Sequence, residues 1–284
     1  MRIARYSTAG QDPAFGVVEL AEDGGAHPDS VSTLTGDPLA GPVQYTGARH
    51  RLADVRLLAP VIPRSKIIGV GRNYAAHAAE LGNEVPTTPL CFFKPNTAVI
   101  GPDEIVVPPT ASSYISYEGE LAVVIGRICK DVPVDRAEEV IFGYTVGNDV
   151  TLRDLQEPDK QWSRAKGFDT SCPLGPWIAT HLTLAEASDL TITTVVAGEQ
   201  RQRGSTALMI RPIAELIAYI TSFTTLLPGD VILTGTPAGV GRLDPGQEVS
   251  VTIDGIGTLT NTLVPTPVAD TTDTTTSTSG DNAK

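Results

Sequence analysis

Basic residues are scarce in this sequence, and their scarcity excludes two classes of partner. Lys and Arg together number 21 against 33 Asp and Glu, so the formal net charge at pH 7 is −12. Affinity for a phosphate backbone depends mainly on clustered Lys and Arg, and attraction to an anionic membrane surface depends on the same charges. We therefore expect neither a nucleic acid nor a membrane as partner.

Cysteine and long apolar runs are also scarce. The chain has Cys91, Cys129 and Cys172, an odd number without a CxxC pair, which is typical of free thiols in a reducing compartment. No apolar run approaches the roughly 20 residues that a membrane-spanning helix needs. The first ten residues also lack the apolar segment of a secretory signal. These absences predict a cytoplasmic protein.

Turn residues and short β-branched segments are abundant instead. The 284 residues include 27 Gly and 22 Pro, and 41% of the chain is hydrophobic. Apolar segments of strand length recur at 66–71, 104–107, 121–125, 145–150, 190–196, 231–233 and 249–253. The pattern predicts a mainly β globular protein with some helix, which is the α+β class.

Helical spacing occurs in three places. Residues 135–142 carry apolar side chains on one face and precede Gly143, and residues 212–226 repeat them at i, i+3, i+4 and i+7 after a first-turn proline. Residues 73–82 are rich in alanine and end at a glycine. We predict a short helix in each segment.

The chain divides into three parts by pattern. Residues 1–62 are weakly patterned and predict a small strand-rich N-terminal domain, followed by a larger unit over 63–264. The Thr-rich stretch 271–280 has no apolar residue to bury, so 265–284 are predicted to form a disordered tail.

Two glutamates lead directly into the apolar run at 117–125. In a strand Glu118 and Glu120 share one face, and like charges side by side are destabilising unless something neutralises them. Mg²⁺ or Mn²⁺ would do so, with Asp149 of another apolar segment as third ligand. Three carboxylates and one such ion leave about one negative charge. A solvated strand face, with Asp149 capping a turn, is the alternative. Without neighbouring His or Cys, zinc is disfavoured.

A candidate general base lies in the predicted helix 73–82. His77 and Glu80 are i and i+3 and therefore neighbours on one face. A carboxylate bonded to an imidazole fixes its tautomer and raises its basicity. The Pro-containing segment 83–89 follows, so the helix could be a mobile lid. An exposed His–Glu pair on a surface helix is the alternative.

Lysines and glycines in apolar surroundings are further candidates. Lys94 and Lys166 could each hold an anionic substrate group or a developing oxyanion, or could extend to water. The Gly-rich segment 69–74 lacks the third glycine of a dinucleotide site, and 235–241 lacks the Lys-Ser/Thr of a phosphate loop. Nucleotide binding is therefore disfavoured, whereas the hydroxyl or N–H of Thr236 could meet a substrate carboxylate.

Taken in order, these segments resemble the fumarylacetoacetate hydrolase family, specifically the catalytic domain of its bacterial members. The resemblance extends from about Lys66 to Val264. The motifs are Gly-Arg-Asn-Tyr-Ala-Ala-His-Ala-Ala-Glu at 71–80, Phe-Phe-Lys-Pro-Asn-Thr-Ala at 92–98, Tyr-Glu-Gly-Glu-Leu at 117–121, Gly-Tyr-Thr-Val-Gly-Asn-Asp-Val-Thr-Leu-Arg-Asp-Leu-Gln at 143–156, Lys-Gly-Phe-Asp-Thr at 166–170, and Gly-Asp-Val-Ile-Leu-Thr-Gly-Thr-Pro-Ala-Gly-Val-Gly at 229–241.

The resemblance implies a mixed β-sandwich or β-roll fold, normally in a homodimer. It also implies roles for residues at the matching positions. The implied metal ligands for Mg²⁺ or Mn²⁺ are Glu118, Glu120 and Asp149. The implied catalytic residues are His77 and Glu80, which activate water on a lid, and Lys166, which lies beside the metal. The implied substrate-binding residues are Arg72, Tyr74, Lys94, Arg153, Gln156 and Thr236.

Family chemistry implies a 2-oxo acid substrate. Its carboxylate and keto oxygens would chelate the cation, which stabilises the enolate formed when a neighbouring C–C bond breaks. Our first hypothesis is an acylpyruvate-type hydrolase or an oxaloacetate decarboxylase. The second is an isomerase or decarboxylase of aromatic catabolism, of the 2-hydroxyhepta-2,4-diene-1,7-dioate type, which does not need a water activator. The intact His77–Glu80 pair favours the first, and the three carboxylates disfavour a catalytically silent scaffold.

Overall fold

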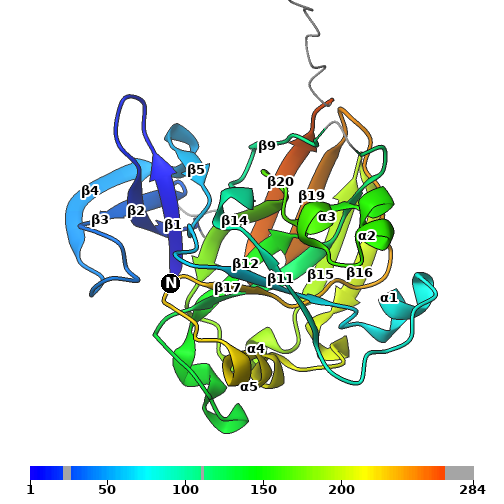
Figure 1. Cartoon of the computed structure of the whole chain (residues 1–284). Helices are drawn as coiled ribbons and strands as arrows, with labels where there is room; N and C mark the ends of the chain where they lie inside the picture. The colour runs from blue at the N-terminus through cyan, green and yellow to red at the C-terminus, as the bar shows by residue number, and fades with distance from the viewer. Residues whose placement is uncertain (22–26, 110–111, 266–284) are drawn as a thin grey trace, which may run out of the picture.

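The N-terminal strands β1 to β5 and strands from later in the chain form one large sheet (Figure 1). The computed structural model of the chain describes residues 1–21, 27–109 and 112–265, and within them this sheet has 12 strands. Its main path, in spatial order, is β4 (Tyr45–Arg51), β3 (Ser30–Leu34), β2 (Ala14–Glu19), β1 (Arg2–Ser7), β14 (Cys172–Ala179), β12 (Ile141–Asn148), β11 (Gly119–Ile125), β17 (Val231–Leu233), β6 (Ile67–Gly71) and β7 (Leu90–Lys94). Off this path, β5 (Arg56–Leu58) pairs with β1, and β8 (Val99–Ile100) pairs with β14.

Two smaller sheets and several short helices complete the fold. The second sheet consists of β16 (Glu199–Ser205), β15 (Thr191–Val196), β19 (Glu248–Ile253), β20 (Gly257–Leu263) and β9 (Ile105–Val106). The third consists of β13 (Thr151–Leu152), β10 (Ile115–Tyr117) and β18 (Gly241–Arg242). The α-helices are α1 (Ala75–Glu80), α2 (Arg153–Asp159), α3 (Ser163–Lys166), α4 (Leu184–Ala187) and α5 (Ile213–Phe223).

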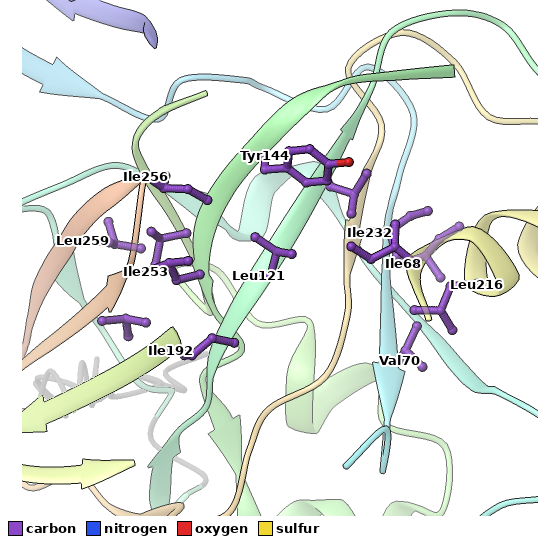
Figure 2. Packing of buried hydrophobic residues seen from close by; sticks show 14 of the residues in the cluster. Ile68, Val70, Leu121, Tyr144, Ile192, Leu216, Ile232, Ile253, Ile256 and Leu259 are labelled. Carbon is purple, nitrogen blue, oxygen red and sulfur yellow. The ribbon is translucent and has the colours of Figure 1, made fainter. Parts of the chain in front are cut away.

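The main core lies between the large sheet, the second sheet and α5. Figure 2 shows Leu121 of β11 with Ile192 and Ile253 of the second sheet on one side and Leu216 of α5 on the other. Each of these four side chains is almost fully buried. Burying one such side chain contributes roughly 1.5–3 kcal/mol. The core therefore holds the two sheets together, and it fixes the position of β11 between them.

Strand β11 is buried on both faces. Leu121 and Val123 belong to the main core, whereas Ala122 and Val124 alternate onto a second cluster that includes Ile3 of β1. Strand β1 is antiparallel to β14, with Ile3 opposite Ile178. The N-terminal strands thus continue the large sheet, and Ile3 of β1 shares a cluster with the second face of β11.

The mainly β, α+β fold predicted from the sequence is confirmed. Each predicted strand segment contains a strand, and the predicted helices at 73–82 and 212–226 are present as α1 and α5, each shorter at both ends. Beyond α5, Leu226 forms a bridge with Cys129.

The α-helix predicted at 135–142 is wrong in type and extent. Residues Val134–Val140 form a 3-10 helix, and Ile141 and Phe142 already belong to β12. Ile141 pairs with Ile125 of β11, so pairing with a neighbouring strand overrides the local helical pattern.

Two sequence predictions concern membranes and the tail. None of the helices in the described ranges is long and apolar enough to cross a membrane. The tail predicted at 265–284 lies outside the described residues except for its first position.

Candidate metal centre

Three carboxylates converge where β11 begins and β12 ends. Gly119 pairs with Asn148 in this antiparallel register, so the residues flanking that pair, Glu118 and Asp149, are adjacent. The N–H of Asp149 donates to the carbonyl oxygen of Glu118 at 2.9 Å. With Glu120, these residues offer carboxylate oxygens that all lie within 4.8 Å of one another, and each residue is at most 4% exposed. The predicted convergence of the three acidic residues is therefore present.

Three basic side chains contact the same carboxylates. Lys166 Nζ donates to Glu118 Oε2 at 2.8 Å and to Asp149 Oδ2 at 2.5 Å. Lys94 Nζ donates to Asp149 Oδ1 at 2.6 Å, and Arg153 Nη2 donates to Glu118 Oε1 at 2.5 Å. Three positive groups thus face three negative ones. The sequence analysis predicted about one negative charge for the metal-bound site, because it counted the three carboxylates and the ion only. With the three basic groups included, a divalent ion would leave an excess of positive charge, which favours an anionic ligand.

Glu120 is the carboxylate that these basic groups do not pair with. Its burial, and then the charges of Asp149 and Glu118, raise its pKa well above the usual range. Its one hydrogen bond in the described residues is from the Gly235 N–H to Oε2 at 2.7 Å. For Glu118, burial opposes ionisation, but Lys166 and Arg153 outweigh it and lower the pKa.

The residues present fit a hard divalent cation. A buried carboxylate such as Glu120, with one neutral donor and two acidic neighbours, is costly to ionise unless a cation approaches it. Three carboxylates with no His or Cys among them form an oxygen-only donor set, which suits Mg²⁺ or Mn²⁺ better than zinc.

A cavity of about 650 Å³ opens onto the carboxylates. Helices α1, α2 and α3 contribute to its wall and lie in the right half of the view in Figure 1. Its lining includes Val70, Gly71, Arg72, His77, Leu81, Asn83, Leu90, Glu118, Glu120, Asp149, Arg153, Gln156, Glu157, Lys160, Trp162, Lys166 and Thr236. The three candidate metal ligands and His77 therefore line the same cavity.

The His77–Glu80 pair has the predicted proximity. His77 Nδ1 lies 3.4 Å from Glu80 Oε2. Glu80 is not part of the cavity lining, and its carboxylate also accepts from the Gly239 N–H at 3.1 and 3.2 Å. Glu80 thus orients the imidazole and joins α1 to the loop before β18.

Four of the predicted substrate-binding residues line the cavity, namely Arg72, Arg153, Gln156 and Thr236. The other two, Lys94 and Tyr74, lie behind its wall. The Lys94 side chain is fully buried against Asp149. Tyr74 is 2% exposed, and its hydroxyl has no hydrogen-bond partner within the described part of the chain. Burial and the nearby Glu120 raise the pKa of Tyr74, so its hydroxyl keeps its proton.

Sequence reasoning named neither Lys160 nor Trp162, and both belong to the cavity wall. A Cβ added to Gly71 would lie 2.8 Å from the Trp162 ring, so this glycine allows the indole to pack on β6. Lys160 lies two residues before Trp162 and also lines the cavity. The close approach of Gly71 to Trp162 depends on tertiary packing, so local sequence carried no signal for it.

Two family models match the chain. Residues 66–264 match the family described as fumarylacetoacetate (FAA) hydrolase, C-terminal, and residues 1–60 match one described as Rv2993c-like, N-terminal. The protein Rv2993c of Mycobacterium tuberculosis is 54% identical over 224 residues, which cover 79% of this chain and 84% of that protein.

Two solved structures resemble this chain, to different extents. The 2-hydroxyhepta-2,4-diene-1,7-dioate isomerase of Mycobacterium marinum is 45% identical with a TM-score of 0.83, covering 93% of this chain and 98% of that one. Fumarylpyruvate hydrolase of Pseudomonas aeruginosa, solved with Mn²⁺ and pyruvate, is 36% identical with a TM-score of 0.67, covering 72% of this chain and 97% of that one. On this evidence the chain is an enzyme that belongs to the fumarylacetoacetate hydrolase family.

Proposed function

We propose that this enzyme is a divalent-metal-dependent hydrolase that cleaves a C–C bond in an acylpyruvate-type 2-oxo acid, with oxaloacetate decarboxylation as a related activity of the same site. The observation that carries the proposal is the shared cavity of His77 and the three carboxylates. A carboxylate-bonded imidazole beside an oxygen-only metal site combines a base for water with electrophilic stabilisation. The similarity to a fumarylpyruvate hydrolase with Mn²⁺ supports it.

Glu118, Glu120 and Asp149 would hold Mg²⁺ or Mn²⁺. When bound, the cation would supply stabilisation of the negative charge on the enolate oxygen. Lys166, which donates to both Glu118 and Asp149, would add a second positive charge near the developing negative charge. Arg153 and Gln156, joined by a 2.9 Å hydrogen bond, present donors on the adjoining wall for the substrate carboxylate.

His77 is the proposed base. Because its Nδ1 faces Glu80, Nε2 is the nitrogen left to accept a proton from water. The deprotonated water would attack the distal carbonyl of an acylpyruvate, and the bond between that carbonyl and the pyruvate carbon would break. The products are a carboxylic acid and the enolate of pyruvate, and the enolate would take up the proton held by His77 to give pyruvate.

Two further basic residues of the cavity lining favour a second anionic group on the substrate. Arg72 and Lys160 line the cavity, and neither has an ion-pair partner among the described residues. Gly71, the neighbour of Arg72, packs against Trp162, which lies two residues after Lys160. Arg72 and Lys160 both have left-handed backbones, with φ of 57° and 55°, a strained geometry that is common at ligand sites. We infer that they select substrates with a distal carboxylate.

An isomerase of the 2-hydroxyhepta-2,4-diene-1,7-dioate type is the second candidate. The structure of that isomerase is more similar to this chain than that of the fumarylpyruvate hydrolase, at 45% against 36% identity. Isomerisation would use the same metal site but transfer a proton between carbons, so His77 would not need to activate water.

A substrate panel tests the proposal. Acetylpyruvate, fumarylpyruvate, oxaloacetate and 2-hydroxyhepta-2,4-diene-1,7-dioate are each incubated with enzyme and Mg²⁺ or Mn²⁺, and the products are identified by chromatography. Pyruvate from an acylpyruvate is the expected result, and conversion of the dienedioate alone would establish the isomerase instead.

Metal dependence is tested with two variants of the ligand set. We expect Glu118→Gln and Asp149→Asn to abolish Mn²⁺-dependent turnover while circular dichroism remains that of the wild type, because each change removes a ligand charge at nearly constant shape. Full activity of the wild type in excess chelator would contradict a metal-dependent mechanism.

We also propose that the enzyme is a cytoplasmic homodimer. Its three cysteines are unpaired, as in proteins of reducing compartments. Strand β7 ends the large sheet and leaves Phe93 50% exposed, which favours contact with a second copy. Light scattering should give twice the 29.9 kDa chain mass, and a value of one chain mass would contradict the dimer.

A further inference from the structure

One buried amide supports the metal centre from the second sheet. Gln202 of β16 is fully buried, although Arg201 and Arg203 beside it are exposed. It is distant in sequence from the carboxylates, and no acidic or basic group pairs with it. A buried amide is costly unless its donors and acceptor are satisfied, so its partners show what holds it there.

The partners of Gln202 form a closed ring of hydrogen bonds. Its Oε1 accepts from the Gly119 N–H at 3.0 Å, and its Nε2 donates to Thr236 Oγ1 at 2.8 Å. Thr236 Oγ1 then donates to the Gly119 carbonyl oxygen at 2.8 Å. The second Nε2 proton goes to the Pro237 carbonyl oxygen, also at 2.8 Å. Gln202 therefore holds Gly119, the residue between Glu118 and Glu120, by both of its backbone polar groups. It binds the Gly119 N–H directly and the Gly119 carbonyl oxygen through Thr236.

Glycines allow the Glu-Gly-Glu segment and the loop 235–241 to lie close to the second sheet. A Cβ on Gly119 would collide with the Thr194 hydroxyl of β15, and a Cβ on Gly239 would collide with the Arg201 carbonyl of β16. The Glu-Gly-Glu segment and the loop 235–241 thus rest directly on the second sheet. The same loop supplies the Gly235 N–H that binds Glu120 and the Thr236 that lines the cavity.

We propose that Gln202 is a positioning residue that sets the spacing of Glu118 and Glu120 for the divalent cation. It also links the Glu-Gly-Glu segment to Thr236, which lines the cavity. The inference rests on the proposed function in that it takes the three carboxylates as a metal site. Because the Thr236 hydroxyl proton is committed to Gly119, this residue meets a substrate through its backbone rather than as a hydroxyl donor. Groups that orient metal ligands typically contribute 10–100-fold to affinity, so Gln202 acts on metal binding without touching the ion.

The test measures Mn²⁺ affinity by isothermal titration calorimetry on the full chain, independently of turnover. We expect Gln202→Leu to raise the Kd for Mn²⁺ by roughly 10–100-fold. The matched control is Gln200→Leu on the same strand, where the side chain is exposed and the Kd should stay within about two-fold of wild type. A purely structural role would lower the melting temperature of Gln202→Leu and leave its Kd unchanged, which would overturn the inference.

A second variant interrupts the ring elsewhere. Thr236→Val removes the hydroxyl that links Gln202 to Gly119 and should also weaken Mn²⁺ binding, and the double variant should bind no more weakly than Gln202→Leu alone. If Gln202→Leu does not fold, wild-type affinity in Thr236→Val overturns the inference. Absence of Mn²⁺ binding by the wild type would overturn the metal centre itself, whereas wild-type binding with unchanged affinity in both variants overturns the role of Gln202 alone.

Discussion

Asp149 accepts a hydrogen bond from each of two buried lysines, and this pairing decides the charge of the site. Lys94 is 55 residues from Asp149 in sequence. A lysine in an apolar segment has the same local pattern whether it extends to water or to a buried carboxylate. The resemblance indicated that Lys94 belongs near the site, but its position behind the cavity wall follows only from tertiary contacts.

His77 allows the two reaction types to be separated. Hydrolysis of an acylpyruvate needs an activated water, whereas loss of CO₂ from oxaloacetate does not. We therefore expect His77→Ala to reduce acylpyruvate hydrolysis by roughly 10²–10⁴-fold and oxaloacetate decarboxylation by much less. Steady-state kinetics with both substrates, at equal Mn²⁺ occupancy, make the comparison. An equal loss in both reactions would show that His77 is not the water activator.

Arg72 and Lys160 lead to a prediction about substrate charge. The double variant Arg72→Gln/Lys160→Gln should raise KM for fumarylpyruvate by about 10–100-fold, since a hydrogen bond to a charged group contributes roughly 1.5–3 kcal/mol. KM for acetylpyruvate, which lacks the distal carboxylate, should change little. Arg136→Gln, at an exposed arginine paired with Glu139, is the control. A similar rise for both substrates would refute distal recognition.

Helix α1 is an element that its neighbours hold in place. Six residues are too few for a helix to be stable alone. Just before it, the Asn73 amide donates to the carbonyl oxygens of Arg211 and Thr234 at 3.1 and 2.8 Å, and its Oδ1 accepts from the Arg211 N–H at 2.8 Å. Glu80 at its last residue bonds the Gly239 N–H. Both ends of this candidate lid are therefore anchored.

The anchoring can be tested by hydrogen exchange. Asn73→Ala leaves buried backbone groups unpaired, at a cost of roughly 1–3 kcal/mol, so amide exchange over residues 74–90 should accelerate by about 10–100-fold. Exchange in β11 and β12 should not change. Asn96→Ala, at an exposed asparagine, is the matched control. Unchanged exchange over 74–90 would show that the amide does not hold the helix.

At the scale of the whole molecule, the N-terminal strands share a core with the catalytic segment. Ile3, Val17 and Leu34 pack in one cluster with Val124 and Leu174. Sequence pattern predicted a small N-terminal domain over 1–62, and in the structure β1 of this segment pairs with β14 of the larger unit. This pairing joins residues more than 170 positions apart, which no local pattern indicates.

Deletion of residues 1–60 should therefore destabilise the rest of the chain. The three N-terminal side chains of the shared cluster contribute roughly 1.5–3 kcal/mol each when buried. We expect the truncated protein to melt at a lower temperature or to aggregate, as measured by calorimetry and size-exclusion chromatography. An unchanged melting temperature would show that the catalytic segment is stable without its N-terminal strands.

The sequence by itself determined the strand-rich character of the chain, the identity of the three acidic residues and the His77–Glu80 pair, because these depend on local periodicity and on ordered motifs. Tertiary structure alone decided that Ile141 joins a strand and that Gln202 contacts the Glu-Gly-Glu segment. It also decided that Lys94, Lys166 and Arg153 pair with Glu118 and Asp149 and leave Glu120 without a basic partner within the described ranges. Each of those outcomes depends on contacts between distant segments, whose geometry is set by the packing of two sheets on a common core.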